Sequence, residues 1–154
     1  MTFLLSDEVA MAVASGHAVV GLETSVIGQG LPHPRNLECV ERMETAIRGA
    51  GATPGWIGVV DGAVRVGLER AELERFAEPD AAVKVTRRDV PATVVSGSLG
   101  ATTVSATIWA AHRAGIVVAA TGGIGGYAIQ PQWGDGHASG IYSFQYLREL
   151  EGKP

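Results

Sequence analysis

An apolar run, Ile116–Ala120, leads directly into Thr121 and a glycine-rich stretch that ends at Gly126. The β-branched residues at its first three positions predict a buried parallel strand. Glycines after such a strand let the backbone approach a ligand closely. Because ligands of open α/β sheets lie at the carboxyl ends of strands, we expect a binding edge here. A tight strand-exit turn without a ligand is the alternative, and it stays open.

The same stretch fits the dinucleotide-binding pattern G-x-G-x-x-A over Gly123–Ala128. That pattern requires a helix directly after the glycines, whose first turn receives the pyrophosphate. Pro131 and two further glycines follow instead, and no helix start is visible. The sequence therefore argues against a nicotinamide site.

The composition bounds the class of protein. The chain has 154 residues, of which 46% are apolar and 18% charged, which is typical of one globular domain. Its net charge of −4 lacks the basic footprint of nucleic-acid binding, and no apolar run could cross a bilayer. A single cysteine, Cys39, and no signal-peptide pattern favour a reducing cytoplasm. We therefore expect a cytoplasmic protein with neither nucleic-acid nor membrane partners.

Helical and strand patterns alternate along the chain. Ser6 is expected to cap the first helix and Asn36 the second, and Asp61-Gly62 predicts a hairpin turn. This order predicts an α/β fold with a mixed, mainly parallel sheet flanked by helices. The predicted helices are 6–15, 36–49, 69–77 and 105–114, and the predicted strands are 18–22, 56–60, 63–66, 81–85 and 116–120.

Charged side chains stand at two of the predicted strand ends. Glu23 directly follows an apolar strand, either as a functional carboxylate or as a solvated terminus. Lys84 lies inside another strand, and Arg87 and Arg88 follow it. These three cations suit a phosphate or carboxylate ligand. An edge lysine and two surface arginines are the alternative, which the sequence leaves open.

The segment Ser96–Val104 precedes a nearly apolar, buried helix. Small residues, hydroxyls and exposed amide groups at such a helix start favour an anion. Asp135 and His137 lie two residues apart in a glycine-rich loop, a spacing more typical of turn chemistry than of a metal site. No metal ligand is assigned.

Four stretches in this order resemble the pseudouridine-5′-phosphate glycosidases, also described as indigoidine synthase A-like proteins. They are Glu23-Thr-Ser with Gly30–Pro34, then Val83–Pro91, Gly100–Val104 and Ala120–Gly126. The resemblance covers about residues 8–126 and implies a truncated version of that family's layered α/β fold. We accordingly divide the chain into a family-like domain, 1–126, and a divergent tail, 127–154, expected to belong to the same domain.

The resemblance implies reversible cleavage of the C–C glycosidic bond of pseudouridine 5′-phosphate to uracil and ribose 5-phosphate. Glu23 corresponds to the family's proton-transferring glutamate, and Lys84 and Val104 to substrate-binding positions. A lysine that forms an imine with the sugar and a divalent metal, usually Mn²⁺, complete the family's chemistry. A homo-oligomer, a trimer in the family, is also implied.

The sequence departs from the family after the glycines. Tyr127-Ala128-Ile129 replaces a His-Arg-Gly stretch, and Tyr142 stands where the metal-binding aspartate is expected. Lys153 is not in the context of the imine-forming lysine. The expectation is therefore a family member with Glu23, Lys84 and the helix start at Val104 facing one hollow, and with little or no turnover as this short chain. A non-catalytic sugar-phosphate-binding domain and one half of a split enzyme are the alternatives.

Overall fold

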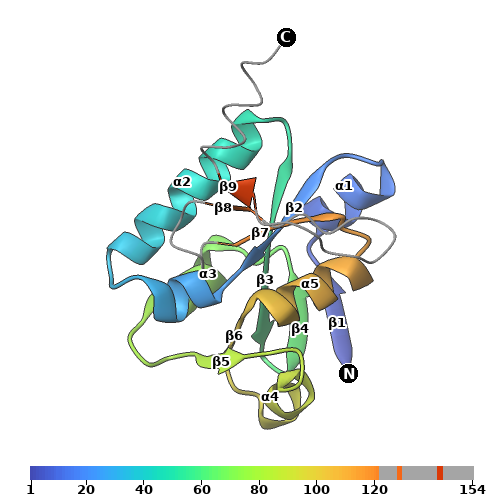
Figure 1. Cartoon of the computed structure of the whole chain (residues 1–154). Coiled ribbons are helices and arrows are strands. Elements are labelled where there is room, and N and C mark those ends of the chain that lie inside the picture. The colour runs from blue at the N-terminus through green and yellow to red at the C-terminus, as the bar shows by residue number, and fades with distance from the viewer. Residues whose placement is uncertain (122–127, 130–141, 144–154) are drawn as a thin grey trace.

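The computed structural model describes residues 1–121, 128–129 and 142–143 (Figure 1). Its main sheet has seven strands in the order β1-β4-β3-β2-β7, and β6 pairs with β3 and β5. β8 and β9 form a separate two-stranded sheet. The strands are β1 Thr2–Leu5, β2 Val19–Glu23, β3 Thr53–Val60, β4 Ala63–Val66, β5 Val83–Val85, β6 Gly100–Thr102, β7 Val118–Ala120, β8 Ala128–Ile129 and β9 Tyr142–Ser143.

Helices cover both faces of the main sheet, α2 and α3 on the left and α1 and α5 on the right of Figure 1. On the α5 face, α1, α4 and α5 bury an alanine- and valine-rich cluster. On the α2 face, α2, α3 and the π-helix η1 bury the larger Trp56, Phe76 and Leu73. The helices are α1 Asp7–Ala14, η1 Val26–Gly30, α2 Arg35–Gly49, α3 Arg70–Ala77, α4 Val90–Ser96 and α5 Val104–Arg113.

The central strand β3 is buried along its whole length and organises the sheet. One of its edges pairs with β4 through the hairpin turn at Asp61-Gly62, as the sequence predicts. The other edge is shared. Its first half pairs in parallel with β2, up to Ile57, and its second half pairs antiparallel with β6. β2 and β6 therefore run toward each other, and their carboxyl ends meet beside Ile57.

The α/β class and the mainly parallel mixed sheet are confirmed. Ser6 caps α1 by accepting a hydrogen bond from the Val9 amide at 3.3 Å, as expected. Asn36, in contrast, does not cap α2, which has Pro34 at that position. Its buried amide instead donates to the carbonyls of Ile27 and Ala77, at 3.3 and 3.1 Å, and joins three segments.

The strand after α5 is less enclosed than predicted. β7 is parallel to β2, but Val117 is 60% exposed and Val118 40% exposed. Within the described residues β7 pairs only with β2 and is the last strand of the sheet, which explains this exposure. None of the helices in the described part of the chain has the length and apolarity that crossing a bilayer requires.

Candidate functional site

The strand junction, where the carboxyl ends of β2 and β6 meet beside Ile57, holds a buried carboxylate. Glu23 ends β2 and is only 2% exposed. Ser25 donates a hydrogen bond to its Oε2 atom at 3.1 Å, and the Thr121 hydroxyl, just beyond β7, donates to its Oε1 atom. Two hydroxyl donors fix the orientation of this carboxylate in surroundings that exclude water. It can therefore accept or deliver a proton at a defined place.

A group of buried threonine hydroxyls joins the two converging strands. Thr24 and Thr102 both donate to the Ile57 carbonyl, at 2.7 and 2.6 Å. The Thr102 amide donates to the Thr24 hydroxyl at 2.9 Å, and Thr107 of α5 donates to the Thr102 hydroxyl at 3.0 Å. The residue after Glu23 is thus tied to the strand that leads into α5. This fixes the carboxylate relative to the start of that helix.

Val104, a predicted substrate-binding position, is the first residue of α5. Thr103 precedes it as the N-cap, and both its amide and its hydroxyl donate to the Val85 carbonyl, at 2.9 and 3.1 Å. The end of β5 is therefore held against the start of α5. The amide groups of a helix's first turn favour an anion, although nothing in the structure tests whether Val104 contacts substrate.

Lys84 leaves its strand on a different face from Glu23. In β5, Lys84 lies beside Ala101, which packs on the α2 face, whereas Val85 packs on the α5 face. Glu23 lies beside Ile57, which also packs on the α5 face. Because successive side chains of a strand alternate between faces, Glu23 and Lys84 point to opposite sides of the sheet.

The expectation that Glu23 and Lys84 face one hollow is therefore not met by the described strands. The physical reason is register, because Val85 takes the core-facing position of the short β5 and turns its neighbour to the other side. Lys84 is solvent-exposed at a strand that pairs only with β6 in the described structure, as the alternative of an edge lysine anticipates. Contact between Lys84 and substrate stays a prediction.

Several predictions fall partly or wholly outside the described residues. The glycines after Thr121, Asp135, His137 and Lys153 all lie outside them, as does most of the tail. Tyr142 lies in β9, which pairs with β8. Among the described residues, no three histidine, cysteine or acidic side chains gather as metal ligands would. The described residues thus do not by themselves fit a metal centre.

A pocket of about 770 Å³ opens at the end of β5. We call it the β5–α5 pocket; its lining residues are Thr86, Arg87, Arg88, Asp89, Pro91 and Ser105. The Arg87 amide donates to the Ser105 hydroxyl at 3.2 Å, which ties the pocket wall to the first turn of α5. Asp89 accepts from the Thr86 amide and hydroxyl, at 3.0 and 2.5 Å. The Thr86 hydroxyl, then its amide, hold the pKa of Asp89 below its usual value.

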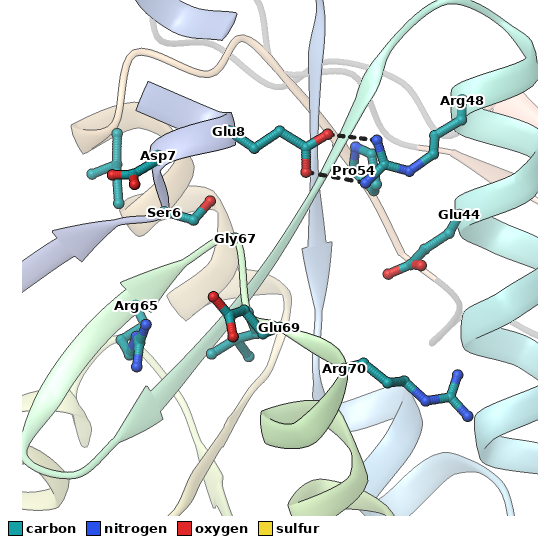
Figure 2. A pocket seen from close by; sticks show the side chains of 12 residues that line it. Ser6, Asp7, Glu8, Glu44, Arg48, Pro54, Arg65, Gly67, Glu69 and Arg70 are labelled. Carbon is teal, nitrogen blue, oxygen red and sulfur yellow. Dashed lines mark hydrogen bonds and ion pairs between the residues drawn. The ribbon is translucent and has the colours of Figure 1, made fainter. Parts of the chain in front are cut away.

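A second pocket, of about 490 Å³, lies between α1 and α2 (Figure 2). In this α1–α2 pocket, Glu8 of α1 and Arg48 of α2 face each other in a two-bond ion pair, at 2.5 and 3.1 Å. Arg65 pairs with Glu72, and Arg70 pairs with Glu41 and Glu74. The lining residues are Leu5, Ser6, Asp7, Glu8, Glu44, Arg48, Pro54, Arg65, Gly67, Leu68, Glu69 and Arg70. Its guanidiniums are already neutralised, so it is a poor anion site.

The sequence pointed to Glu23 but missed the threonine group that positions it. β6 has only three residues, Gly100–Thr102, and carries no alternating pattern. One sequence pattern could have indicated this group: Thr102, Thr103 and Thr107 cluster around the start of an otherwise apolar helix. Hydroxyls at that spacing are typical of helix starts, so the pattern does not distinguish a cap from a link between strands.

Comparison with known families finds one match, to the family described as indigoidine synthase A-like protein, over residues 8–132. Curated relatives are identical to this chain at about half of the aligned positions. A pseudouridine-5′-phosphate glycosidase of Roseobacter denitrificans is 50% identical over 121 residues, and one of Rhodospirillum centenum is 52% identical over 122 residues. Each alignment covers 79% of this chain but only 39% and 38% of the relative. The chain thus spans about two fifths of the length of these relatives.

Solved structures agree with the sequence relatives. The prealnumycin C-glycosynthase AlnA, determined in complex with ribulose 5-phosphate, superposes with a TM-score of 0.70 at 41% identity. An indigoidine synthase A-like protein from Thermotoga maritima gives a TM-score of 0.69 at 34% identity. Both matches cover 79% of this chain and 39% of the other. The fold of the matched part of this chain is therefore shared with these two solved structures.

Proposed function

Because the chain belongs to the indigoidine synthase A-like family, we propose that it carries the proton-transferring part of a pseudouridine-5′-phosphate glycosidase site. The single observation that supports this most is the buried Glu23 carboxylate, held by Ser25 and Thr121 where the strand ends meet. A solved relative in complex with ribulose 5-phosphate supports a pentose phosphate as the ligand class.

Glu23 is suited to one step of this reaction. When the bond between the sugar and the uracil ring breaks, the uracil carbon that leaves must gain a proton, and the reverse reaction must remove it. A carboxylate that is 2% exposed and oriented by two hydroxyls can move that proton without competition from water. Carbon is a poor leaving group, and when the uracil carbon leaves with the bonding electron pair the sugar carbon is left electron-deficient. Cleavage therefore also needs a nitrogen that shares its electrons with that carbon, as the family's lysine does when it forms the imine.

Turnover by this chain of 154 residues is a separate matter. We expect it to bind ribose 5-phosphate and to release little or no uracil from pseudouridine 5′-phosphate, with or without added Mn²⁺. Chromatography measures uracil release, and calorimetric titration measures the binding of ribose 5-phosphate. Sustained turnover that Glu23→Gln abolishes would establish a complete enzyme instead. Failure of millimolar ribose 5-phosphate to bind would contradict the proposed ligand.

The finer assignments are proposals of the same kind. Mn²⁺ as the family's metal and a homotrimer are what the family resemblance implies, and the single cysteine, Cys39, favours a cytoplasmic location. Exposed apolar side chains at Val118, which begins the last strand of the described sheet, and at the preceding Val117 support association with another chain. Light scattering of the purified chain checks this, and a monomer at high concentration would contradict the proposed oligomer.

A further inference from the structure

Two buried threonines in helices use their hydroxyls differently. In α4, Thr93 donates to the carbonyl of Asp89, four residues earlier, at 2.9 Å, a local bond that threonines inside helices commonly form. In α5, the Thr107 hydroxyl leaves its helix and donates to the Thr102 hydroxyl of β6 at 3.0 Å. Both side chains are buried, at 7% and 2% exposure, so each hydroxyl needs a partner. Thr93 finds it within its own helix, whereas Thr107 links α5 to the strand junction.

The Thr107 proton completes the order of hydrogen bonds at this junction. The hydroxyl protons of Thr24 and Thr102 both go to the Ile57 carbonyl, at 2.7 and 2.6 Å. Their two oxygens lie 3.3 Å apart, and neither hydroxyl has a second proton to place between them. Each oxygen accepts from elsewhere instead, Thr24 from the Thr102 amide and Thr102 from the Thr107 hydroxyl. Every hydroxyl proton in the group thus has one defined acceptor.

Removal of the Thr107 hydroxyl would disturb this order at Thr24. The Thr102 oxygen would lose a donor, and the Thr24 hydroxyl, whose oxygen is 3.3 Å away, is close enough to turn toward it. Turning would withdraw the Thr24 proton from its carbonyl acceptor in β3 and loosen the bond that fixes this residue. Thr24 stands between Glu23 and Ser25, whose hydroxyl donates to the Glu23 carboxylate. A change at Thr24 therefore reaches the carboxylate and its donor together.

We propose that Thr107 is a positioning residue for Glu23 and acts through Thr102 and Thr24. This inference rests on the proposed function, because the exact place of the carboxylate matters for the reaction only if Glu23 moves a proton. Thr107 is buried where α5 packs on the sheet, so its effect on Glu23 is indirect. The helix that begins at Val104 thus also holds, through an interior hydroxyl, the acid at the end of a different strand.

The test is NMR of the full chain at neutral pH, with isotope label in the glutamate side-chain carboxyl carbons. The Glu23 signal is identified by its absence in Glu23→Gln. We expect Thr107→Val, which keeps the shape of the side chain but removes its hydroxyl, to shift the Glu23 signal. Thr107→Ala, a second variant without the hydroxyl, should do the same, and Thr107→Ser should return the signal toward its original place. Circular dichroism confirms that each variant is folded.

The matched control is Thr93→Val, which also removes a buried hydroxyl but one whose bond stays within α4. It should leave the Glu23 signal unchanged. Amide hydrogen exchange separates positioning from a loss of overall stability, because the Thr102 amide donates to the Thr24 hydroxyl and its exchange rate reports that bond. In Thr107→Val we expect this amide to exchange at least about tenfold faster relative to the amides that pair β3 with β4.

Four outcomes would overturn the assignment. They are an unchanged Glu23 signal in the two variants without the hydroxyl, an equal shift in Thr93→Val, no return of the signal in Thr107→Ser, and exchange at Thr102 that rises no more than in the β3–β4 pairing. None of these measurements uses a ligand or turnover, so each leaves the proposed function standing. That function fails separately, if the unmodified chain does not bind ribose 5-phosphate.

Discussion

Two pockets lined by residues that the structure describes use arginine in opposite ways. In the α1–α2 pocket, Arg48 pairs with Glu8 (Figure 2). Arg65 and Arg70 also pair with glutamates, so that the ion pairs link α1, α2, β4 and α3. In the β5–α5 pocket, Arg87 and Arg88 have no such partner in the described structure. The presence of arginines therefore does not by itself identify an anion site. Whether nearby carboxylates already pair with the arginines determines how well a pocket can attract an anion.

The comparison extends to how each region is held together. The contacts that line the α1–α2 pocket are exposed ion pairs, whose individual contributions to stability are small. The strand junction is held by buried hydroxyls, each of which would leave a carbonyl or hydroxyl without a partner if removed. We therefore expect the loss of unfolding free energy on mutation to depend on how buried the altered side chain is, rather than on whether it is charged.

The largest expected loss of stability runs against this comparison, because it comes from a residue of the α1–α2 pocket. Gly67 has a φ of +87°, and a Cβ there would lie 2.7 Å from Val9 Cγ2. We expect Gly67→Ala to lower the free energy of unfolding by about 3 kcal/mol or more, from backbone strain and overpacking together. Urea denaturation measures this.

Gly97→Ala is the matched control, since Gly97 has a φ of +69° but no atoms within 4 Å of the added Cβ. It should cost only the backbone term, about 1 kcal/mol. Equal losses in the two variants would show that the close fit of Gly67 against α1 contributes nothing.

The next effect sharpens the comparison at the strand junction. Thr102→Val keeps the shape of a residue that is 1% exposed but removes the donor to the Ile57 carbonyl and the acceptor for Thr107. The expected loss in unfolding free energy is about 1–3 kcal/mol, measured by urea denaturation. Ser96→Ala, at an exposed hydroxyl that bonds the Thr93 carbonyl, is the control and should change stability by less than about 0.5 kcal/mol. A loss no larger than that of the control would remove the distinction between buried and exposed contacts.

The smallest effect concerns the ion pair of the α1–α2 pocket. The hydrogen bond from Arg48 lowers the pKa of Glu8, and both side chains are about half exposed. Glu8→Gln should therefore cost only about 0.2–1 kcal/mol at neutral pH. Because the folded pKa lies below the unfolded one, this contribution is present above the unfolded pKa and is lost as the pH falls through the folded pKa.

The measurement is the difference in urea midpoint between the unmodified chain and Glu8→Gln, at pH 7 and at pH 3, and at low and high salt. The difference should shrink at the lower pH and at 1 M salt. Glu38→Gln, at an exposed carboxylate in the first turn of α2 without an ion pair among the described residues, removes only an interaction with the helix dipole, so Glu8→Gln should cost more than this control at pH 7 and low salt. A difference that persists at pH 3 would mean that Glu8 acts through packing.

The sequence anticipated the parts of this molecule that depend on neighbouring residues. The hairpin at Asp61-Gly62 and the Ser6 cap both follow from local patterns, and the structure has them. Glu23 at a strand end was also found in this way. The interpretation of Asn36 as a cap was wrong, because its partners lie in η1 and α3, far along the chain.

The predictions that failed concern residues whose orientation depends on the register between short strands. Strand β5 has three residues and no strong alternation, so nothing local decides whether Lys84 or Val85 faces the core. Pairing with β6 decides it, and β6 was itself missed. The exposure of Val117 and Val118 has a similar origin, since an apolar run is typical of a central strand and of an edge strand alike.

The shared edge of β3 has a consequence for how this site can vary. The distance between Thr24 and Thr102 is set by the number of residues in β3 on either side of Ile57. One residue gained or lost there would shift β6 by about 3.3 Å and turn its side chains to the opposite face. The spacing between Glu23 and the start of α5 is thus encoded by a count of residues in the interior, while the surface loops remain free to change length.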